Sequence, residues 1–119
     1  MSPLPRLIEL EKDARNFGFE WPDAFMILDQ IVDECREVRE ELFLNPPKKL
    51  QEEVGDLLHA AFSLCLFLNL DMEETLSKTN DKFEKRMLAL KTLTQDSGLS
   101  NLKGQSLELM LNLWREVKK

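Results

Sequence analysis

A chain of 119 residues with 43% hydrophobic and 32% charged side chains has the composition of one globular domain with a modest core, not of a disordered chain. Its formal net charge of −6 argues against free nucleic acid as a partner, because binding to phosphate backbones requires a basic face. The N-terminus lacks a basic, apolar signal sequence, and the apolar run after Asp56 is too short to span a membrane. We therefore expect a cytoplasmic protein without a membrane partner.

Apolar side chains recur at helical spacing along the chain, and no segment reads as a strand. We expect an all-α fold, a four- to five-helix antiparallel bundle that forms one domain over residues 1–119. The predicted helices cover residues 3–16, 23–44, 47–70, 71–93 and 106–118. Gly18 is predicted to end the first helix. One stripe on the second helix is predicted to face the core, and it consists of Leu28, Ile31, Cys35, Val38 and Leu42.

Two pairs of acidic side chains lie on consecutive predicted helices. Glu34 and Glu37 share one face of the second helix because they are three residues apart. Glu53 and Asp56 have the same spacing on the third helix. The short NPPKK turn between the two helices predicts that they are antiparallel neighbours. Counted from this turn, the two acidic pairs lie at similar heights, so we expect them to converge.

Converging carboxylates repel one another, and this repulsion predicts a metal site. Two unit charges about 4 Å apart cost about 4 kcal/mol at an effective dielectric constant of 20. A hard divalent cation with oxygen ligands relieves that cost, which indicates Mg²⁺, with Mn²⁺ as the other candidate. Gly55 lies between two of the acids, where a helical glycine costs about 1 kcal/mol and indicates a close backbone approach. Taken singly, each acidic pair also fits an ordinary solvated helix surface.

Other metal and nucleophile patterns are weaker in this sequence. His59 is the single histidine, so two E-x-x-H motifs of a di-iron site cannot be formed. The sequence contains no Gly-rich phosphate loop, no G-x-S-x-G motif and no Cys/His zinc spacing. Without an evident protein nucleophile, a water molecule activated by a metal is the natural nucleophile.

The segment NDKFEKR on the predicted fourth helix carries candidate phosphate ligands. Lys82 and Arg86 are four residues apart, and such a pair can grip phosphate oxygens. Lys82 and Arg86 lie on one side of the apolar stripe of this helix, and Asn80 lies on the other side. The alternative is that the two cations are solvated and pair with Glu84 or Asp81.

Candidate contacts to a nucleotide recur near the end of the chain and in the NPPKK turn. Trp114 and Lys118 are four residues apart, so they lie on the same side of a helix. The indole of Trp114 could stack on a nucleotide base, and the charge of Lys118 could bind a phosphate. Trp114 on its own also fits an anchor of the last helix in the core. Lys49 lies about one helical turn before Glu53, so it can face the same site as the acidic pairs.

The ordered set of these motifs resembles a known family. E-x-x-E at residues 34–37, E-x-x-D within EEVGDLL, and NDKFEKR follow one another as in the MazG-type nucleotide pyrophosphohydrolases of the all-α NTP pyrophosphatase superfamily, to which the dimeric dUTPases are related. FGFEWPD before the second helix and LWREVKK at the end are similar to that family's flanks. The resemblance covers roughly residues 17–118. Its single motifs are nonspecific, whereas their order is fairly specific.

The resemblance implies Mg²⁺-dependent hydrolysis of a nucleoside triphosphate to the monophosphate and pyrophosphate, in nucleotide-pool house-cleaning. It implies four acids that bind metal and form the catalytic centre: Glu34, Glu37, Glu53 and Asp56. It implies six substrate-binding residues: Lys49, Asn80, Lys82, Arg86, Trp114 and Lys118. It also implies a homodimer or homotetramer. The motif does not fix the base preference.

As a mechanism, we expect water to attack the α-phosphorus while a carboxylate such as Glu37 accepts the water's proton. Lys82 and Arg86 would neutralise charge on the leaving pyrophosphate. Two alternatives stay open at this point. One is a non-catalytic helical dimerisation or interaction module with solvated acidic faces, and the other is a dUTP- or dCTP-selective pyrophosphatase of the same fold.

Overall fold

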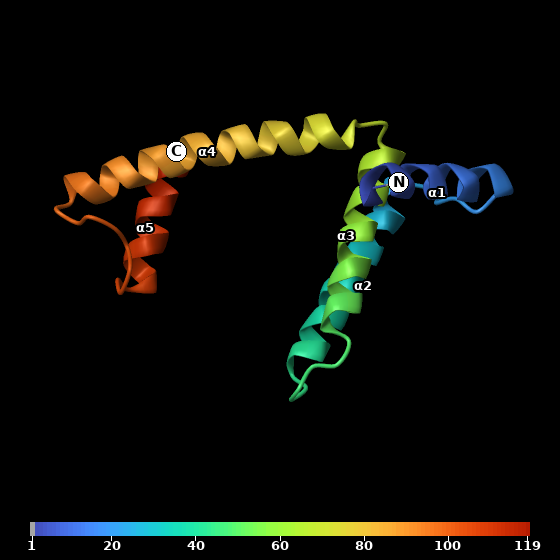
Figure 1. Cartoon of the computed structure of the whole chain (residues 1–119), viewed down its shortest axis with the longest axis horizontal. Coiled ribbons are helices and arrows are strands. Elements are labelled where there is room, and N and C mark those ends of the chain that lie inside the picture. Colours follow the sequence, from blue (N-terminus) through green and yellow to red (C-terminus); the bar gives the residue numbers. More distant parts are fainter. Residues whose placement is uncertain (1) are drawn as a thin grey trace. The chain divides into compact units, whose positions relative to one another are not determined.

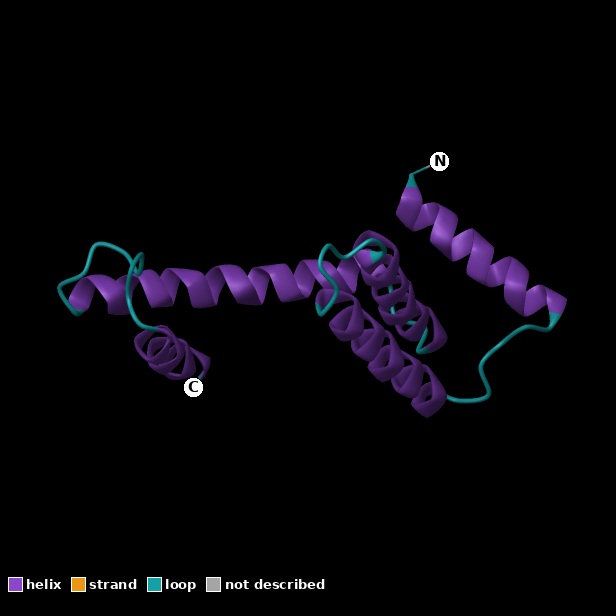
Figure 2. Cartoon of the chain, turned by 90° about the horizontal axis from the view of Figure 1, so that it is seen from below, coloured by secondary structure: helices purple, strands orange, loops and turns teal. Residues whose placement is uncertain are grey.

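The computed structural model describes residues 2–119, and all the regular structure in this range is helical (Figures 1 and 2). The five helices are α1 (Pro3–Phe17), α2 (Ala24–Leu42), α3 (Leu50–Phe67), α4 (Met72–Asp96) and α5 (Leu107–Lys118). The prediction of an all-α fold is therefore confirmed. The chain divides into two compact units, Met1–Met72 and Glu73–Lys119. That residues 1–119 form a single domain stays a prediction.

In the first unit, α2 and α3 lie side by side and antiparallel, joined by the turn over residues 43–49 (Figure 1). The backbone N–H of Lys49 donates a 2.7 Å hydrogen bond to the buried carboxylate of Glu41, which ties the turn to the end of α2. Helix α1 packs against α3. The buried apolar side chains of this unit come from each helix and from the start of α4: Leu7, Ile27, Ala60 and Met72.

The helix ends follow local chemistry. Asp23 caps α2 by accepting a 2.9 Å hydrogen bond from the N–H of Met26. Gly18 ends α1 in the left-handed conformation with φ 102°, as predicted. Helix α3 ends at Phe67, three residues before the predicted end, because Asn69 turns the chain with φ 58°. It begins at Leu50 instead of residue 47, after two prolines that cannot donate hydrogen bonds.

The predicted core stripe of α2 is wrong for three of its five residues, whereas Ile31 and Val38 are half-buried. Leu28 and Leu42 are 43% and 60% exposed, and Cys35 is exposed. The residues that α2 buries are Ile27, Glu34 and Glu41. The buried face is thus displaced by one residue from the most apolar face, and it includes two glutamates.

The second unit consists of α4 from Glu73 onward and of α5, which a loop connects. Ser106 caps α5 by accepting a 3.2 Å hydrogen bond from the N–H of Leu109. The aromatic rings of Phe83 and Trp114 join the two helices, with 6.1 Å between their centroids. Helix α4 runs to Asp96, three residues beyond the predicted end, and the chain then turns at Gly98 with φ 84°.

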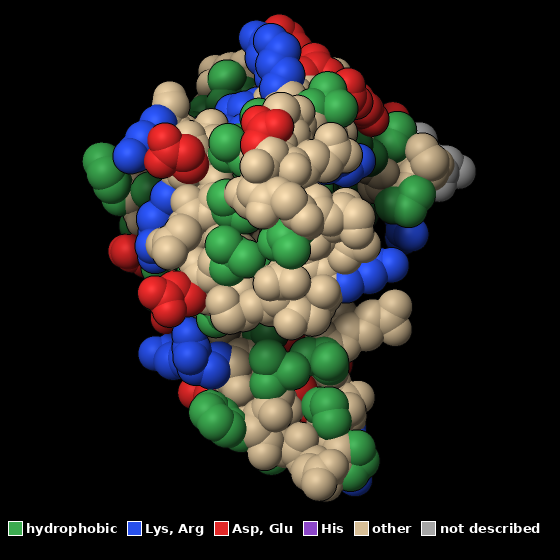
Figure 3. Space-filling view, turned by 90° about the vertical axis from the view of Figure 1, so that its left-hand side faces the viewer, with side chains coloured by type: hydrophobic (Ala, Val, Ile, Leu, Met, Phe, Trp, Pro, Cys, Tyr) green, Lys and Arg blue, Asp and Glu red, His purple; other side chains and the backbone are tan. Residues whose placement is uncertain are grey.

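Large hydrophobic side chains are exposed in both units. On the face that Figure 3 shows, such side chains (green) lie at the surface among charged ones. Among residues 2–119, no single helix is long and apolar enough to cross a membrane, and only α3 and α4 together, as a bent pair, meet that test.

Candidate functional site

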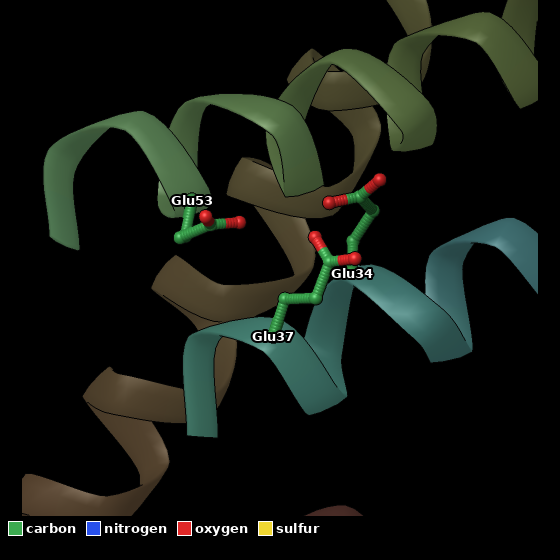
Figure 4. Close-up of side chains that lie close together, drawn as sticks. All are labelled: Glu34, Glu37 and Glu53. Carbon is green, nitrogen blue, oxygen red and sulfur yellow. The ribbon is translucent and has the colours of Figure 1, made fainter. Parts of the chain in front are cut away.

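Three of the four acids of the two pairs meet at the interface of α2 and α3, as the sequence predicted for Glu34, Glu37 and Glu53. Carboxylate oxygens of these three residues all lie within 4.8 Å of one another. Figure 4 shows Glu34 and Glu37 extending from α2 toward α3, with Glu53 on α3 facing them. Glu34 is buried, Glu53 is half-buried and Glu37 is exposed, so the cluster runs from the core to the surface. We call these three residues the acidic cluster.

Two carboxylate oxygens of the acidic cluster are buried and have no hydrogen-bond partner within the described residues. They are Oε2 of Glu34 and Oε2 of Glu53. A buried polar atom without a partner costs about 1–3 kcal/mol, and more when it is charged. Such atoms need an explanation, and a bound cation is one of the standard explanations.

The electrostatics of Glu34 agree with this assignment. Burial raises the pKa of Glu34 above its ordinary value of 4.5, and the carboxylates of Glu37 and Asp56 raise it further. The hydrogen bond that Gln30 donates to Oε1 of Glu34 opposes the rise in pKa. The site therefore disfavours the ionised form of Glu34 until positive charge is supplied.

The residues present fit a hard divalent cation. Their donors are carboxylate oxygens only, from three side chains that already converge, and Mg²⁺ and Mn²⁺ prefer such ligands. Asp56 is exposed and lies outside the group within 4.8 Å, although its charge acts on Glu34. Asp56 is thus placed at the edge of the site.

Gly55 does not mark a close approach within this chain. A Cβ atom built on Gly55 would meet no heavy atom within 4 Å. The predicted backbone contact is therefore absent from the described part of the chain. Lys49 is the residue before α3, exposed and one turn before Glu53, whose N–H bonds to the carbonyl of Lys49 at 2.9 Å.

A cavity of about 810 Å³ opens beside the acidic cluster, within the first unit. Glu34 and Asp56 line one part of it, and the aromatic side chains of Phe19, Trp21 and Phe67 line other parts. Its volume lies in the range of about 300–1,000 Å³ that is typical of small-molecule sites.

The same cavity contains polar side chains that the sequence analysis did not single out as functional. Ser63 is buried on α3, and its hydroxyl donates a short hydrogen bond to Oε1 of Glu11 on α1. Nε2 of His59 lies 3.9 Å from the same oxygen of Glu11. In the sequence, these residues could have been noticed as one acid within the apolar stripe of α1 and one serine within the apolar run of α3.

The second unit places the basic candidates around a cavity of its own, of about 510 Å³. It is lined by Lys78, Asp81, Lys82, Lys85, Arg86, Val117 and Lys118. The structure thus brings Lys82, Arg86 and Lys118 together. Asn80 and Trp114 are not among the lining residues, and Trp114 packs on Phe83.

The family model that matches this chain is described as the MazG nucleotide pyrophosphohydrolase domain, and it covers residues 25–89. The chain belongs to the MazG family. The resemblance predicted from the motifs is thus confirmed. The MazG match includes both acidic pairs and the NDKFEKR segment, whereas α1, Trp21 and α5 lie outside it.

Curated relatives agree with the MazG assignment. The nucleoside triphosphate pyrophosphohydrolase of Escherichia coli (strain K12) is 34% identical over 118 residues, which are 98% of this chain and 44% of that protein. The nucleoside triphosphate pyrophosphohydrolase/pyrophosphatase MazG of Thermotoga maritima is 32% identical over 109 residues, 92% of this chain and 41% of that protein. This chain therefore spans less than half the length of either relative.

Proposed function

We propose that this chain hydrolyses a nucleoside triphosphate to the nucleoside monophosphate and pyrophosphate, with Mg²⁺ or Mn²⁺, as a cytoplasmic enzyme of nucleotide-pool house-cleaning. The observation that carries the proposal is the acidic cluster, with its two buried carboxylate oxygens, on a segment that matches the MazG domain. The adjoining cavity of about 810 Å³ is large enough for a nucleotide.

Glu34, Glu37 and Glu53 would hold the metal, with Asp56 at its edge. When bound, a divalent cation lowers the pKa of a water molecule and offsets the charge of the phosphates. The buried oxygens of Glu34 and Glu53 would gain the partner that they otherwise lack. Because these residues come from two packed helices, a metal site there would be largely formed before the substrate arrives.

The chain's own groups then position the reaction. Glu37 is the most exposed member of the acidic cluster, and it is our candidate to accept the proton of the attacking water. The oxygen of that water bonds to the α-phosphorus, the bond from this phosphorus to the bridging oxygen breaks, and pyrophosphate leaves. Lys82, Arg86 and Lys118 are our candidate phosphate ligands, supported by the cavity that they share.

We further propose that the chain assembles as a homodimer or homotetramer. Several large apolar side chains of α2 and α3 are exposed in the single chain, among them Leu28, Val32, Leu42 and Leu58. Exposed apolar surface on one face commonly marks a contact with another chain.

The experiment is to measure pyrophosphate release from a panel of NTPs and dNTPs, with Mg²⁺ and with a chelator. We expect metal-dependent release, and we expect Glu53→Gln to remove most of it while the fold persists. Glu52→Gln is the matched control, because Glu52 is the exposed neighbour of Glu53 on α3. Near-normal activity of Glu53→Gln would refute its assignment as a metal ligand.

The same experiment separates an enzyme from a non-catalytic interaction module. A module with a solvated acidic face predicts no release with any nucleotide and no thermal stabilisation by Mg²⁺ with nucleotide. A binding site predicts stabilisation by about 2.7 kcal/mol at a ligand concentration of a hundred times the dissociation constant.

A further inference from the structure

The cavity beside the acidic cluster is also lined by a carboxylate that does not belong to that cluster. Glu11 lines this cavity from α1, and only 18% of its side chain is exposed. Asp56 and Ser63, which both line the cavity from α3, are seven residues apart, or roughly 10 Å at 1.5 Å per residue. That is the scale of a nucleotide from its 5′ phosphate to the far edge of its base. A nucleotide with its phosphates at the acidic cluster would therefore extend its base toward Glu11 and Ser63.

A hydrogen bond from Ser63 holds one of the two carboxylate oxygens of Glu11. Ser63, itself 6% exposed, donates to Oε1, and Nε2 of His59 lies near the same atom. Among the described residues, the structure gives Oε2 of Glu11 no hydrogen-bond partner. A carboxylate only accepts hydrogen bonds. As a lining residue, Glu11 thus offers the cavity a hydrogen-bond acceptor and no donor.

Such an acceptor distinguishes bases by their edges. Cytosine, adenine and guanine each carry an exocyclic amino group that donates hydrogen bonds, and a carboxylate can accept from it. At the position where cytosine and adenine carry this amino group, uracil and hypoxanthine carry a carbonyl oxygen, which a carboxylate at that position repels; their ring N–H donors lie beside the carbonyl, and guanine carries its amino group at another ring position. Trp21 lines the same cavity and gives a flat face on which any base can stack, so it does not discriminate between them.

We propose that Glu11 selects the base, so that this chain prefers nucleotides with an exocyclic amino group over those with a carbonyl in its place. The proposal rests on the proposed function, because it assumes that the nucleotide binds with its phosphates at the acidic cluster. It concerns a residue outside the segment that matches the MazG domain, so family membership does not imply it.

The test uses substrates that differ in one group. In the presence of Mg²⁺, kcat/KM is compared between dCTP and dUTP and between ATP and ITP, since each pair exchanges an amino group for a carbonyl on a ring of the same size. We expect the amino member to be preferred by about ten- to a hundredfold, the value of one hydrogen bond to a charged group. A ratio near one in the unmodified chain would overturn the proposal.

Variants show whether Glu11 is responsible. Glu11→Gln places an amide, which can both donate and accept, in the same space, and the ratio should fall toward one or invert. Glu11→Asp keeps the carboxylate and should keep a preference for the amino member. Glu9→Gln is the matched control, because Glu9 is exposed on the same helix, and its ratio should equal that of the unmodified chain. A purely structural role of Glu11 would lower kcat/KM for both members equally, and that result would overturn the proposal.

Failure of the proposed hydrolysis can be distinguished from failure of the proposed role of Glu11. If no nucleotide is hydrolysed, the thermal stabilisation of the unmodified chain by dCMP and by dUMP, each with Mg²⁺, decides the base preference without any chemistry. Larger stabilisation by dCMP, lost in Glu11→Gln, would support the role of Glu11. Equal stabilisation by both, or by neither, would overturn it.

Discussion

Glu34 is the residue on which the candidate site depends most. It lies on the buried face of α2, yet it carries an oxygen without a hydrogen-bond partner in the described chain and an elevated pKa. A buried carboxylate of this kind lowers the stability of the protein when it is ionised and unpaired. We therefore interpret the acidic cluster as a set of metal ligands. A bound metal would remove the free-energy cost of keeping these carboxylates ionised and close together.

This predicts how stability depends on pH. Because the pKa of Glu34 is raised in the folded state, the folded chain binds a proton more tightly there than the unfolded chain does. The contribution of Glu34 is most favourable below the ordinary pKa of 4.5, and it is lost as pH rises through the higher folded-state pKa. Denaturant unfolding of metal-free protein at a series of pH values should therefore show wild type losing free energy of unfolding relative to Glu34→Gln as pH rises.

The difference between the two proteins isolates Glu34 from the other titrating groups, which are common to both. Saturating Mg²⁺ should reduce or reverse the loss, because the metal favours the ionised carboxylate. If wild type and Glu34→Gln follow parallel curves in metal-free buffer, the charge of Glu34 is not destabilising.

The polar residues of the cavity could be found from the sequence only in part. The acidic pairs were predicted because spacing and turn length place them on adjacent helices at one height, and this depends on backbone geometry alone. Glu11, Ser63 and Trp21 come from three separate segments, and their meeting depends on how α1 packs on α3. No short-range pattern encodes that packing, so these residues appeared only with the structure.

At the scale of the helix, α2 shows that a hydrophobic pattern locates the apolar face of a helix without telling which surface packs against that face. The apolar stripe through Leu28, Cys35 and Leu42 predicted the core face, but α2 buries the neighbouring face through Ile27 and Glu34. Periodicity gives the direction of the apolar stripe, and it does not tell whether the same chain or another copy lies against it. The existence of the five helices was predictable because apolar side chains recur at helical spacing along the chain.

The N-cap of α2 is predicted to stabilise the first unit. Asp23 accepts a hydrogen bond from Met26 N–H, and its loss in Asp23→Ala should cost about 1 kcal/mol of unfolding free energy. Ser2 is the matched control, since it occupies the N-cap position of α1 without a side-chain hydrogen bond to that helix. Urea unfolding should thus show little change for Ser2→Ala. Equal effects of the two substitutions would mean that the cap of α2 contributes nothing.

Gly55 gives a second prediction for a helix. It lies inside α3, and a Cβ atom there would meet nothing within 4 Å among residues 2–119. Gly55→Ala should therefore raise the unfolding free energy of the chain by about 1 kcal/mol, through helix propensity alone. Urea unfolding at a low protein concentration measures this gain. A lower stability there would show that the chain does use the close approach that the sequence had suggested. A gain in stability with a loss of nucleotide turnover would instead place a substrate or partner against Gly55.

For the whole molecule, the exposed apolar face of α2 is the strongest reason to expect more than one chain. Val32 is 66% exposed, and Leu28 and Leu42 are exposed on the same helix. Such a face on a small domain leaves apolar area in water that a second copy could bury. Among the described residues of the first unit, only four apolar side chains are buried, and so small a core agrees with stability that depends partly on association.

We therefore predict that the mass measured by sedimentation corresponds to two or four chains, and that the melting temperature rises with protein concentration. Val32→Glu should lower the mass to that of one chain, because a charge would be buried in the contact. In an isolated chain the same substitution is cheap, since Val32 already faces solvent. Asp29→Ser is the matched control, because Asp29 is an exposed polar residue on the same helix and its replacement introduces no charge. A single-chain mass for the unmodified protein at every concentration would refute the assembly, and the apolar face of α2 would then need another partner.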